Sequence, residues 1–201
     1  MTQAVTDIHN GLDDSPRGRI LLAAAHLFRH KGFERTTVRD LAQEVGIQSG
    51  SIFHHFKTKE EILRHVMIEV ILFNTERMRR ELAAAESPRD RLLALIRAEL
   101  RSINGDTGEA MAVLTNEWRS LKPDSQKEIL TLRDRYEQMW LDVLNEAQQA
   151  GLIPRQVDTF ILRRFLTGAL AWSNFWYDPN GSLNIDQLAQ QALVLAIKES
   201  D

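Results

Sequence analysis

Apolar residues recur along this chain every three or four positions, the spacing that places them on one face of an α-helix. Nearly every segment after residue 16 shows this period, and no strand-like alternation, repeat or low-complexity tract interrupts it. The apolar stripes predict about nine helices, which contain residues 20–28, 38–45, 48–56, 62–85, 92–100, 111–118, 129–147, 160–176 and 185–196. The pattern therefore predicts an all-α protein.

Residues that start or end helices lie between these stripes. Gly32 ends the first stripe, and Thr37 can cap the second. Thr58 and Glu61 form a Thr-x-x-Glu capping box at the start of the long fourth stripe, and Asp158 can cap the eighth. Because these signals coincide with the changes in periodicity, they support the helix boundaries.

Charge is unevenly distributed along the 201 residues, although the net charge is only −3. Residues 1–16 hold three acids and no base, and we expect them to form a mobile arm. Residues 17–64 hold nine Lys or Arg and five Asp or Glu, a sum of +4, whereas residues 65–201 hold 16 bases and 20 acids, a sum of −4. We therefore predict a basic domain over 17–64, followed by an acidic domain over 65–201.

Composition and motif content exclude several classes of protein. The chain has no cysteine, so it can form neither a disulfide nor a thiolate zinc site, and it has no run of roughly 18 apolar residues that could span a membrane. The first ten residues lack a secretory signal, and we expect a cytoplasmic protein. No nucleophile–base pattern, phosphate-binding glycine loop or metal triad is present, so the sequence predicts neither an enzyme nor a cofactor or metal site.

The most informative stretch runs from Thr36 to Lys57, with the sequence TTVRDLAQEVGIQSGSIFHHFK. Two short amphipathic stripes flank Gly46, which permits a sharp turn. This is the pattern of a helix-turn-helix, in which the second helix enters the major groove of DNA. At the start of that helix, Gln48 can read adenine through two hydrogen bonds, and Gly50 allows close approach to the DNA backbone.

Other groups near this helix suit the phosphates of DNA, although His54 and His55 can equally be neutral residues that pack beside the groove. The hydroxyl of Thr37 is expected to cap the preceding helix. The residues predicted to contact DNA are Thr37, Arg39, Gln48, Ser49, Gly50, Ser51, Phe53, His54, His55 and Lys57.

Residues 17–64 resemble the DNA-binding region of the TetR family of bacterial transcriptional regulators. The resemblance is carried by ILLAAAHLFRHKGFERTTVRDLAQEVGIQSGSIFHHFKTKEEIL, with the family's Ala-x-x-Leu-Phe, Gly-Phe, Thr-Thr-Val and Phe-Lys-x-Lys landmarks in order. It implies a homodimer whose last two helices form a four-helix bundle, and repression of an operator that is relieved when a small molecule enters the larger domain. The sequence departs from the family at Phe53, where tyrosine is common, and in lacking a frequent basic residue at the start of the recognition helix.

A second resemblance involves the larger domain. Glu117-Trp118-Arg119, the run LRDRYEQMW over 132–140 and the run GALAWSNFWYDPNGSL over 168–183 are similar to the branch of the family that answers to acyl-CoA thioesters of steroid and fatty-acid breakdown. This resemblance implies an effector with an apolar acyl or ring group and an anionic CoA tail. The residues predicted to bind it are Met111, Trp118, Arg119, Arg133, Met139, Trp140, Trp172 and Trp176.

These features also have purely structural interpretations. Tryptophan and methionine at helical spacing usually fill the core of an all-α domain, and Arg133 can pair with Glu137 one turn away. Glu61, His65 and Glu69 share one helix face, where surface ion pairs are far more common than a metal site. For most of these residues the structural interpretation is the more frequent one.

The last two predicted helices are apolar on wide faces, which favours a homodimer interface over the core of a monomer. A twofold dimer can place two recognition helices in successive major grooves. The long fourth helix joins the two domains and is expected to transmit movement between them. The predicted function is a homodimeric DNA-binding repressor released by a small apolar effector. The alternatives are a multidrug-type sensor on the same scaffold and a helical interaction protein that does not bind DNA.

Overall fold

The computed structural model describes residues 12–198, and within that range it contains nine α-helices, two short 3₁₀-helices and no strand. The all-α prediction is confirmed. The helices are α1 (Pro16–Lys31), α2 (Val38–Val45), α3 (Ser49–Ile52), α4 (Lys59–Ala83), α5 (Pro88–Asn104), α6 (Gly108–Asn116), η1 (Trp118–Ser120), α7 (Pro123–Gln149), α8 (Thr159–Trp172), η2 (Ser173–Phe175) and α9 (Ile185–Ala196).

The predicted arm over residues 1–16 lies mostly outside the described residues, because the description begins at residue 12. In the part that is described, Leu12 is buried in the hydrophobic core. Ser15 caps α1, since its hydroxyl accepts a hydrogen bond from the backbone N–H of Gly18 at 3.0 Å. None of the described helices is long and apolar enough to cross a membrane.

Side chains that the sequence marks as caps do bind the first turns of helices. Thr37 Oγ1 accepts from the Asp40 N–H at 3.1 Å, and the Asp40 carboxylate accepts from the Thr37 N–H at 2.7 Å, which completes a capping box. Thr58 Oγ1 accepts from the Glu61 N–H at 3.0 Å, but the Glu61 carboxylate accepts from the N–H of Lys57 at 2.7 Å. The predicted box at Thr58 is therefore only half formed, and Glu61 instead holds the residue that precedes the cap.

Three helices end earlier than the apolar pattern predicts. The recognition helix α3 is regular for only four residues, after which the backbone N–H groups of His55 and Phe56 both donate to the last carbonyl of α3. Trp118 lies in the separate η1 rather than in α6, and η2 follows α8 before the chain reaches Trp176. These ends are tight turns because side-chain packing, which periodicity does not report, decides where each helix stops.

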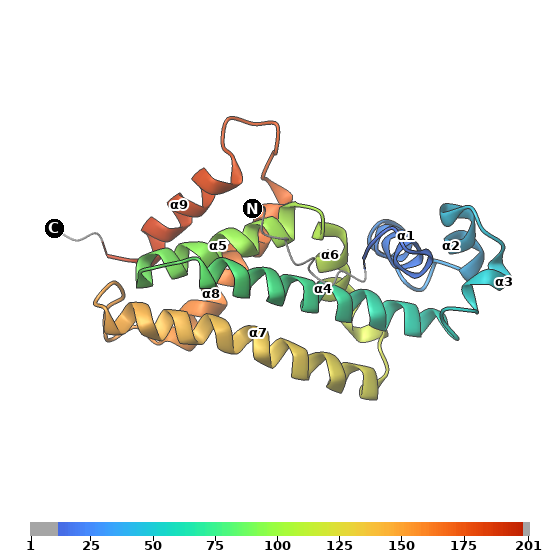
Figure 1. Cartoon of the computed structure of the whole chain (residues 1–201), viewed down its shortest axis with the longest axis horizontal. Coiled ribbons are helices and arrows are strands. Elements are labelled where there is room, and N and C mark those ends of the chain that lie inside the picture. The colour runs from blue at the N-terminus through green and yellow to red at the C-terminus, as the bar shows by residue number, and fades with distance from the viewer. Residues whose placement is uncertain (1–11, 199–201) are drawn as a thin grey trace, which may run out of the picture.

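The head, made of α1, α2 and α3, lies at one end of the molecule, and α4 runs from it into the larger domain (Figure 1). The predicted domain boundary between residues 64 and 65 falls inside α4. One hydrophobic core joins the head to the larger domain, because Phe28 of α1 and Val66 of α4 share it with Ala110 and Val113 of α6. The head is thus attached through two helices, α4 and α6. A second core, around the fully buried Trp140, lies farther along the larger domain.

Candidate functional site

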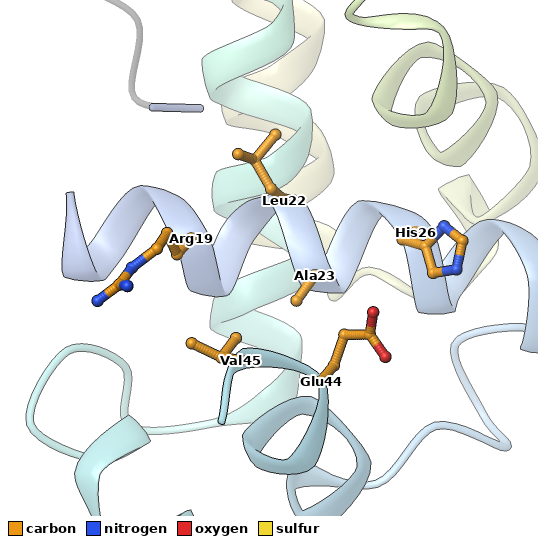
Figure 2. A pocket seen from close by; sticks show the side chains of 6 residues that line it. All are labelled: Arg19, Leu22, Ala23, His26, Glu44 and Val45. Carbon is orange, nitrogen blue, oxygen red and sulfur yellow. The ribbon is translucent and has the colours of Figure 1, made fainter. Parts of the chain in front are cut away.

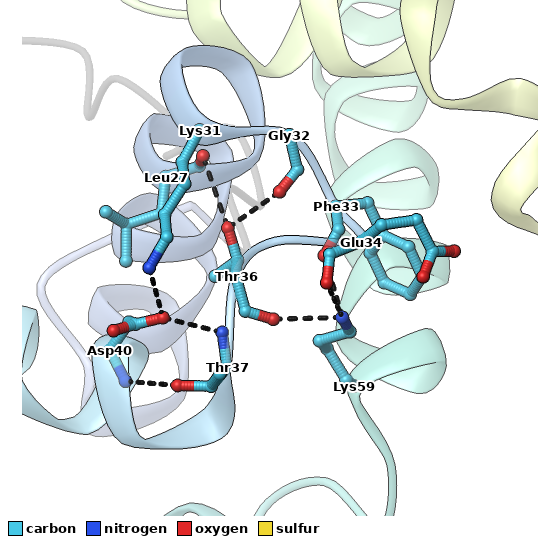
Figure 3. A network of polar contacts seen from close by, with 9 residues as sticks. All are labelled: Leu27, Lys31, Gly32, Phe33, Glu34, Thr36, Thr37, Asp40 and Lys59. Carbon is cyan, nitrogen blue, oxygen red and sulfur yellow. Dashed lines mark hydrogen bonds and ion pairs between the residues drawn. The ribbon is translucent and has the colours of Figure 1, made fainter.

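The Lys59 ammonium group holds the loop between α1 and α2 against the start of α4 (Figure 3). Its Nζ donates hydrogen bonds to the carbonyl oxygens of Phe33 at 2.7 Å, Thr36 at 2.9 Å and Glu34 at 3.4 Å. The same Nζ lies 4.2 Å from the centre of the Phe33 ring. Lys59 therefore has a structural role within the head, because it holds the loop between α1 and α2 in place.

The Asp40 carboxylate connects α1 with the start of α2 (Figure 3). In addition to its bond with Thr37, it forms an ion pair of 2.6 Å with Lys31 Nζ. The hydrogen bond from Lys31 is the main cause that lowers the pKa of Asp40 to about 2, and the bonds from Thr37 act in the same direction. Asp40 is therefore ionised at neutral pH and holds the first helix of the helix-turn-helix against α1.

The ten residues predicted to contact DNA all lie on the surface of the head. Two of them, Ser49 and Ser51, are half-buried, and the other eight are exposed, including Phe53 with 55% of its surface accessible. A β-carbon placed on Gly50 meets no atom within 4 Å, so internal packing does not require glycine there. This surface can present hydroxyl, amide, imidazole and cationic groups to a polyanion, since none of them is needed in a core.

A cavity of about 700 Å³ lies in the larger domain, lined from α4, α5, α6, η1, α7, α8 and η2. Its volume falls in the range of about 300–1,000 Å³ that is usual for small-molecule sites. Apolar lining residues come from most of these helices, and they include Ile71, Ile103, Met111, Leu114, Trp118 and Phe175. The cavity is therefore suited to a ligand with a substantial apolar portion.

Four buried polar atoms on residues that line the cavity have no hydrogen-bond partner in the described part of the chain. They are Asn74 Nδ2, Glu99 Oε2, the Tyr136 hydroxyl and Arg163 Nε. Asn74, Glu99 and Arg163 are only 1%, 5% and 9% exposed. Because an unsatisfied buried polar atom costs about 1–3 kcal/mol, such a group is typical of a site where a ligand supplies the missing partners.

Glu99 is the most perturbed of these groups. Burial raises its pKa to about 7, although the indole of Trp140 and the positive charge of Arg163 oppose the shift. A carboxyl group with this pKa exists in both protonation states near neutral pH, so it can donate as well as accept a hydrogen bond.

The arginines of the cavity have different surroundings. Arg163 forms an ion pair of 2.6 Å with Glu137, and among the described residues Arg133 forms no ion pair with Glu137. The Arg133 guanidinium instead lies 5.8 Å from the centre of the Trp118 ring. Arg133 and Arg164 both line the cavity and are exposed, so their charges are accessible to an anionic group at its edge.

The cavity brings together four of the eight residues predicted to bind an effector, namely Met111, Trp118, Arg133 and Trp172. The other four, Arg119, Met139, Trp140 and Trp176, are not among the described residues that line it. Five further lining residues were not predicted from the sequence, namely Asn74, Glu99, Tyr136, Arg163 and Arg164. Each of these is a polar residue at an ordinary helical position, and no local signal distinguishes it from a residue on a solvated face.

The three polar residues considered as an unfavoured metal site form an ordinary cluster with α1. His65 Nδ1 lies 2.8 Å from the Arg17 guanidinium, and Arg17 also pairs with Glu69 at 3.0 Å. Glu61 binds the backbone of Lys57 instead. The ion-pair interpretation is confirmed for Glu69, whereas His65 forms a hydrogen bond with Arg17.

The helix-turn-helix head and its exposed polar recognition segment define the class of protein, a DNA-binding transcriptional regulator. Residues 20–66 match the family described as bacterial regulatory proteins, tetR family, and residues 85–199 match the tetracyclin repressor-like C-terminal domain. The chain therefore belongs to the TetR family. It is a DNA-binding transcriptional repressor and not an enzyme.

Several known proteins are similar over nearly the whole chain. The HTH-type transcriptional repressor KstR2 of Mycobacterium tuberculosis is 32% identical, and the match covers 93% of this chain and 94% of the relative. The structure of KstR2, described as a ketosteroid transcriptional regulator, has a TM-score of 0.83 and covers 95% of this chain and 99% of that chain.

Two further crystal structures share the fold. Superantigen PfiT is 60% identical, with a TM-score of 0.78 and coverage of 93% of this chain and 98% of that chain. AibR in complex with isovaleryl coenzyme A and operator DNA is 23% identical, with a TM-score of 0.77 and coverage of 88% of this chain and 95% of that chain. At that identity, AibR supports the fold alone.

Proposed function

We propose that this repressor is a homodimer that leaves its operator when an acyl-CoA thioester occupies the cavity. The observation that carries the proposal is the set of four unpartnered polar atoms on residues that line a cavity with both apolar and polar walls. The apolar walls suit an acyl or ring group, and Asn74 Nδ2 and Arg163 Nε would donate hydrogen bonds to its carbonyl oxygens once these side chains turn toward the cavity. The complex of AibR with isovaleryl coenzyme A supports the compatibility of this fold with a thioester.

The charges around the cavity favour an anionic ligand. Three arginines line it, whereas Glu99 and Glu137 are the acidic residues among its lining residues in the described chain, and Glu137 already pairs with Arg163. Exposed guanidinium groups on Arg133 and Arg164 can bind the phosphates of a CoA tail through paired hydrogen bonds. This arrangement argues against the multidrug-type alternative, in which the ligand is a lipophilic cation.

The route from the cavity to DNA runs through α6. Met111 and Leu114 of α6 line the cavity, and Ala110 and Val113 of the same helix pack in the core shared with α1. A ligand that fits best when α6 has shifted would move the head, and the two heads of a dimer would then no longer match successive major grooves.

The test is thermal stabilisation of the full chain by CoA thioesters, their free acids and lipophilic cations. A ligand at a hundred times its dissociation constant adds about 2.7 kcal/mol to stability. We expect stabilisation by a thioester but not by its free acid, and loss of the effect in the double variant Arg133→Gln, Arg164→Gln. Arg135→Gln, an exposed α7 residue outside the cavity lining, is the matched control. Stabilisation by cations alone would overturn the acyl-CoA assignment.

The proposed dimer uses α8 and α9, and its support is the distribution of exposed apolar surface. Eight of the twelve large hydrophobic residues exposed in the described chain lie between residues 160 and 195, including Phe165 at 74% and Leu195 at 89%. Trp172 is 62% exposed and also lines the cavity, so a second copy of the chain on this face would border the ligand. Such a surface is much more apolar than that of a typical monomer.

The dimer is tested by the double variant Phe165→Asp, Leu195→Asp, with molar mass measured by light scattering. We expect a folded monomer whose operator affinity is reduced by at least about tenfold, because the two half-sites are then bound independently. Leu130→Asp places the same charge on an exposed leucine of α7 and should leave the dimer intact. A dimer that persists in the double variant contradicts the proposed interface.

A second candidate function rests on the 60% identity with the protein described as superantigen PfiT. Under this interpretation the exposed aromatic face of α8 and η2, with Phe165, Trp172 and Phe175, contacts a host protein. T-cell stimulation by the purified chain, compared with the Phe165→Asp variant, tests it. Stimulation without operator binding would favour the interaction-protein alternative over the repressor.

A further inference from the structure

One cluster of metal-ligating side chains in the described chain lies outside the cavity, where the head meets the larger domain. His26 and His30 are one turn apart on α1, and Glu109 approaches them from α6. Glu109 Oε1 lies 2.9 Å from His26 Nδ1 and 3.1 Å from His30 Nε2. The three atoms all lie within 4.8 Å of one another. Two imidazole nitrogens and one carboxylate oxygen therefore converge on a single point.

This convergence matches the dimensions of a zinc site. Zn²⁺ holds nitrogen and oxygen ligands at about 2.0–2.2 Å, which separates neighbouring ligand atoms of a tetrahedron by about 3.3–3.6 Å. For an ion to bind, the two separations from Glu109 Oε1 must open by a few tenths of an ångström. The two imidazole nitrogens, which lie within 4.8 Å of each other, must also come to about 3.3–3.6 Å through rotation of the exposed histidine side chains. Imidazole and carboxylate ligands suit zinc and neighbouring divalent metals of the first transition row.

The surroundings give an ion access to the cluster. Both histidines are exposed and Glu109 is half-buried. His26 also borders a shallow depression of about 340 Å³ between α1 and α2. Figure 2 shows this depression, with Glu44 extending from α2 toward the end of α1 that carries His26. Solvent can therefore reach the position that a fourth ligand would occupy.

The helices that carry the ligands are already held together. Phe28 of α1 and Ala110 of α6 belong to the same hydrophobic core, and each is within two residues of a proposed ligand. Preorganised ligands lose little freedom when an ion binds, which favours binding over rearrangement.

We propose that His26, His30 and Glu109 bind one divalent ion of the zinc class, with water as the fourth ligand, and that the ion fastens the DNA-binding head to α6. The sequence analysis predicted no metal site. The His-x-x-x-His spacing was visible in the sequence, but the third ligand follows His30 by 79 residues, so only the packing of α6 on α1 brings it into place.

The position of the ion gives it a regulatory consequence, which rests on the proposed function. Because α6 also lines the effector cavity, a metal bridge between α1 and α6 would tighten the connection through which a shift of α6 moves the head. With the ion bound, less effector should be needed to release the operator.

Metal binding is tested first, without DNA or effector, so that its result is independent of the proposed function. Zn²⁺ is titrated by calorimetry into the full chain, purified without a histidine tag, and Co²⁺ is followed by its visible absorption. We expect one ion per chain and a loss of affinity of at least about tenfold in His26→Gln, His30→Gln and Glu109→Gln. Glu34→Gln, an exposed carboxylate in the loop between α1 and α2, is the control and should bind as the wild type does.

The outcomes separate the site from its consequence. Zn²⁺ binding that is absent, or that is equal in the wild type and in the triple variant His26→Gln, His30→Gln, Glu109→Gln, overturns the site. Circular dichroism of the variants, and their operator affinity without metal, show whether they are folded. If the site is correct, Zn²⁺ should lower the effector concentration that half-releases the operator by at least about threefold in the wild type and leave it unchanged in the triple variant. An equal response in both overturns the coupling.

Discussion

The polar groups of the head and those around the effector cavity differ in how many hydrogen-bond partners they have. In the head, Lys59 and Asp40 each bind several partners, so that the loop and helix ends around them are complete. In the cavity, Asn74, Glu99 and Arg163 are more than nine-tenths buried and each keeps an unpartnered atom. The head is therefore a rigid surface that needs nothing more to keep its shape, whereas the cavity has polar groups that a ligand can complete.

The largest expected effect tests the separation between core and cavity. Trp140 is fully buried in the second core and does not line the cavity, although the sequence suggested it as a ligand contact. Trp140→Ala should lower the free energy of unfolding by about 3–5 kcal/mol, as measured by urea denaturation. Trp140→Phe removes the indole that acts on Glu99, so it should change effector affinity per folded molecule only slightly, whereas Trp118→Phe at the cavity wall should weaken it more. The reverse pattern would place Trp140 in the ligand site.

The next effect concerns the buried acid of the cavity. Glu99 keeps its proton in the folded chain up to about pH 7 but loses it near pH 4.5 when unfolded, so its contribution to stability is complete below pH 4.5 and is lost as pH rises through 7. The full shift corresponds to about 3 kcal/mol. The amide introduced by Glu99→Gln carries no charge at any pH, so the free energy of unfolding of this variant should exceed that of the wild type by a margin that grows between about pH 5 and pH 8, up to about 3 kcal/mol. Parallel stability curves would contradict it, and Glu86→Gln, an exposed residue, is the control.

A smaller effect probes the structural role of Lys59 within the head. Lys59→Met keeps most of the side-chain volume but removes the ammonium group that binds three carbonyl oxygens. We expect a loss of about 2 kcal/mol in the free energy of unfolding and weaker operator binding, because the loop before α2 is released. Lys198→Met, at the opposite end of the chain, should change neither quantity. An unchanged stability in Lys59→Met would show that water replaces the ammonium group without penalty.

The smallest effect tests the outer surface of the head. Lys57 is exposed and predicted to contact a phosphate, so Lys57→Gln should leave stability unchanged while weakening binding to all DNA sequences alike. The slope of log affinity against log salt concentration should fall in magnitude by about 1, measured by fluorescence anisotropy. Lys198→Gln provides the matched loss of charge away from the head. An unaltered slope would remove Lys57 from the predicted contact set.

The head was predicted well from the sequence because its helix caps and its turn depend on residues only a few positions apart. The capping bonds of Thr37 and Asp158 and the left-handed conformation of Gly46, with φ of 74°, follow from local chemistry. The length of α3 was overestimated, since the apolar stripe continues through Phe56 although the regular helix stops at Ile52. Periodicity shows which side of a segment is buried and does not show where its last turn tightens.

The cavity was predicted only in part. Trp118 and Trp172 were found because tryptophans are conspicuous in any helix. Glu99 was missed because its burial depends on α7 and α8, which follow it by tens of residues. The pairing of Arg163 with Glu137, rather than of Arg133 with Glu137, likewise joins two different helices.

The amino-acid sequence by itself determined the helical class, the helix-turn-helix and the residues exposed on it, since periodicity, caps and turn glycines are properties of neighbouring residues. Only the tertiary structure decided which polar side chains are buried around one cavity, and that His26 and His30 meet Glu109. The physical reason is distance along the chain. Contacts between residues tens of positions apart are set by how whole helices pack, and the apolar stripes that drive this packing say little about the polar residues it encloses.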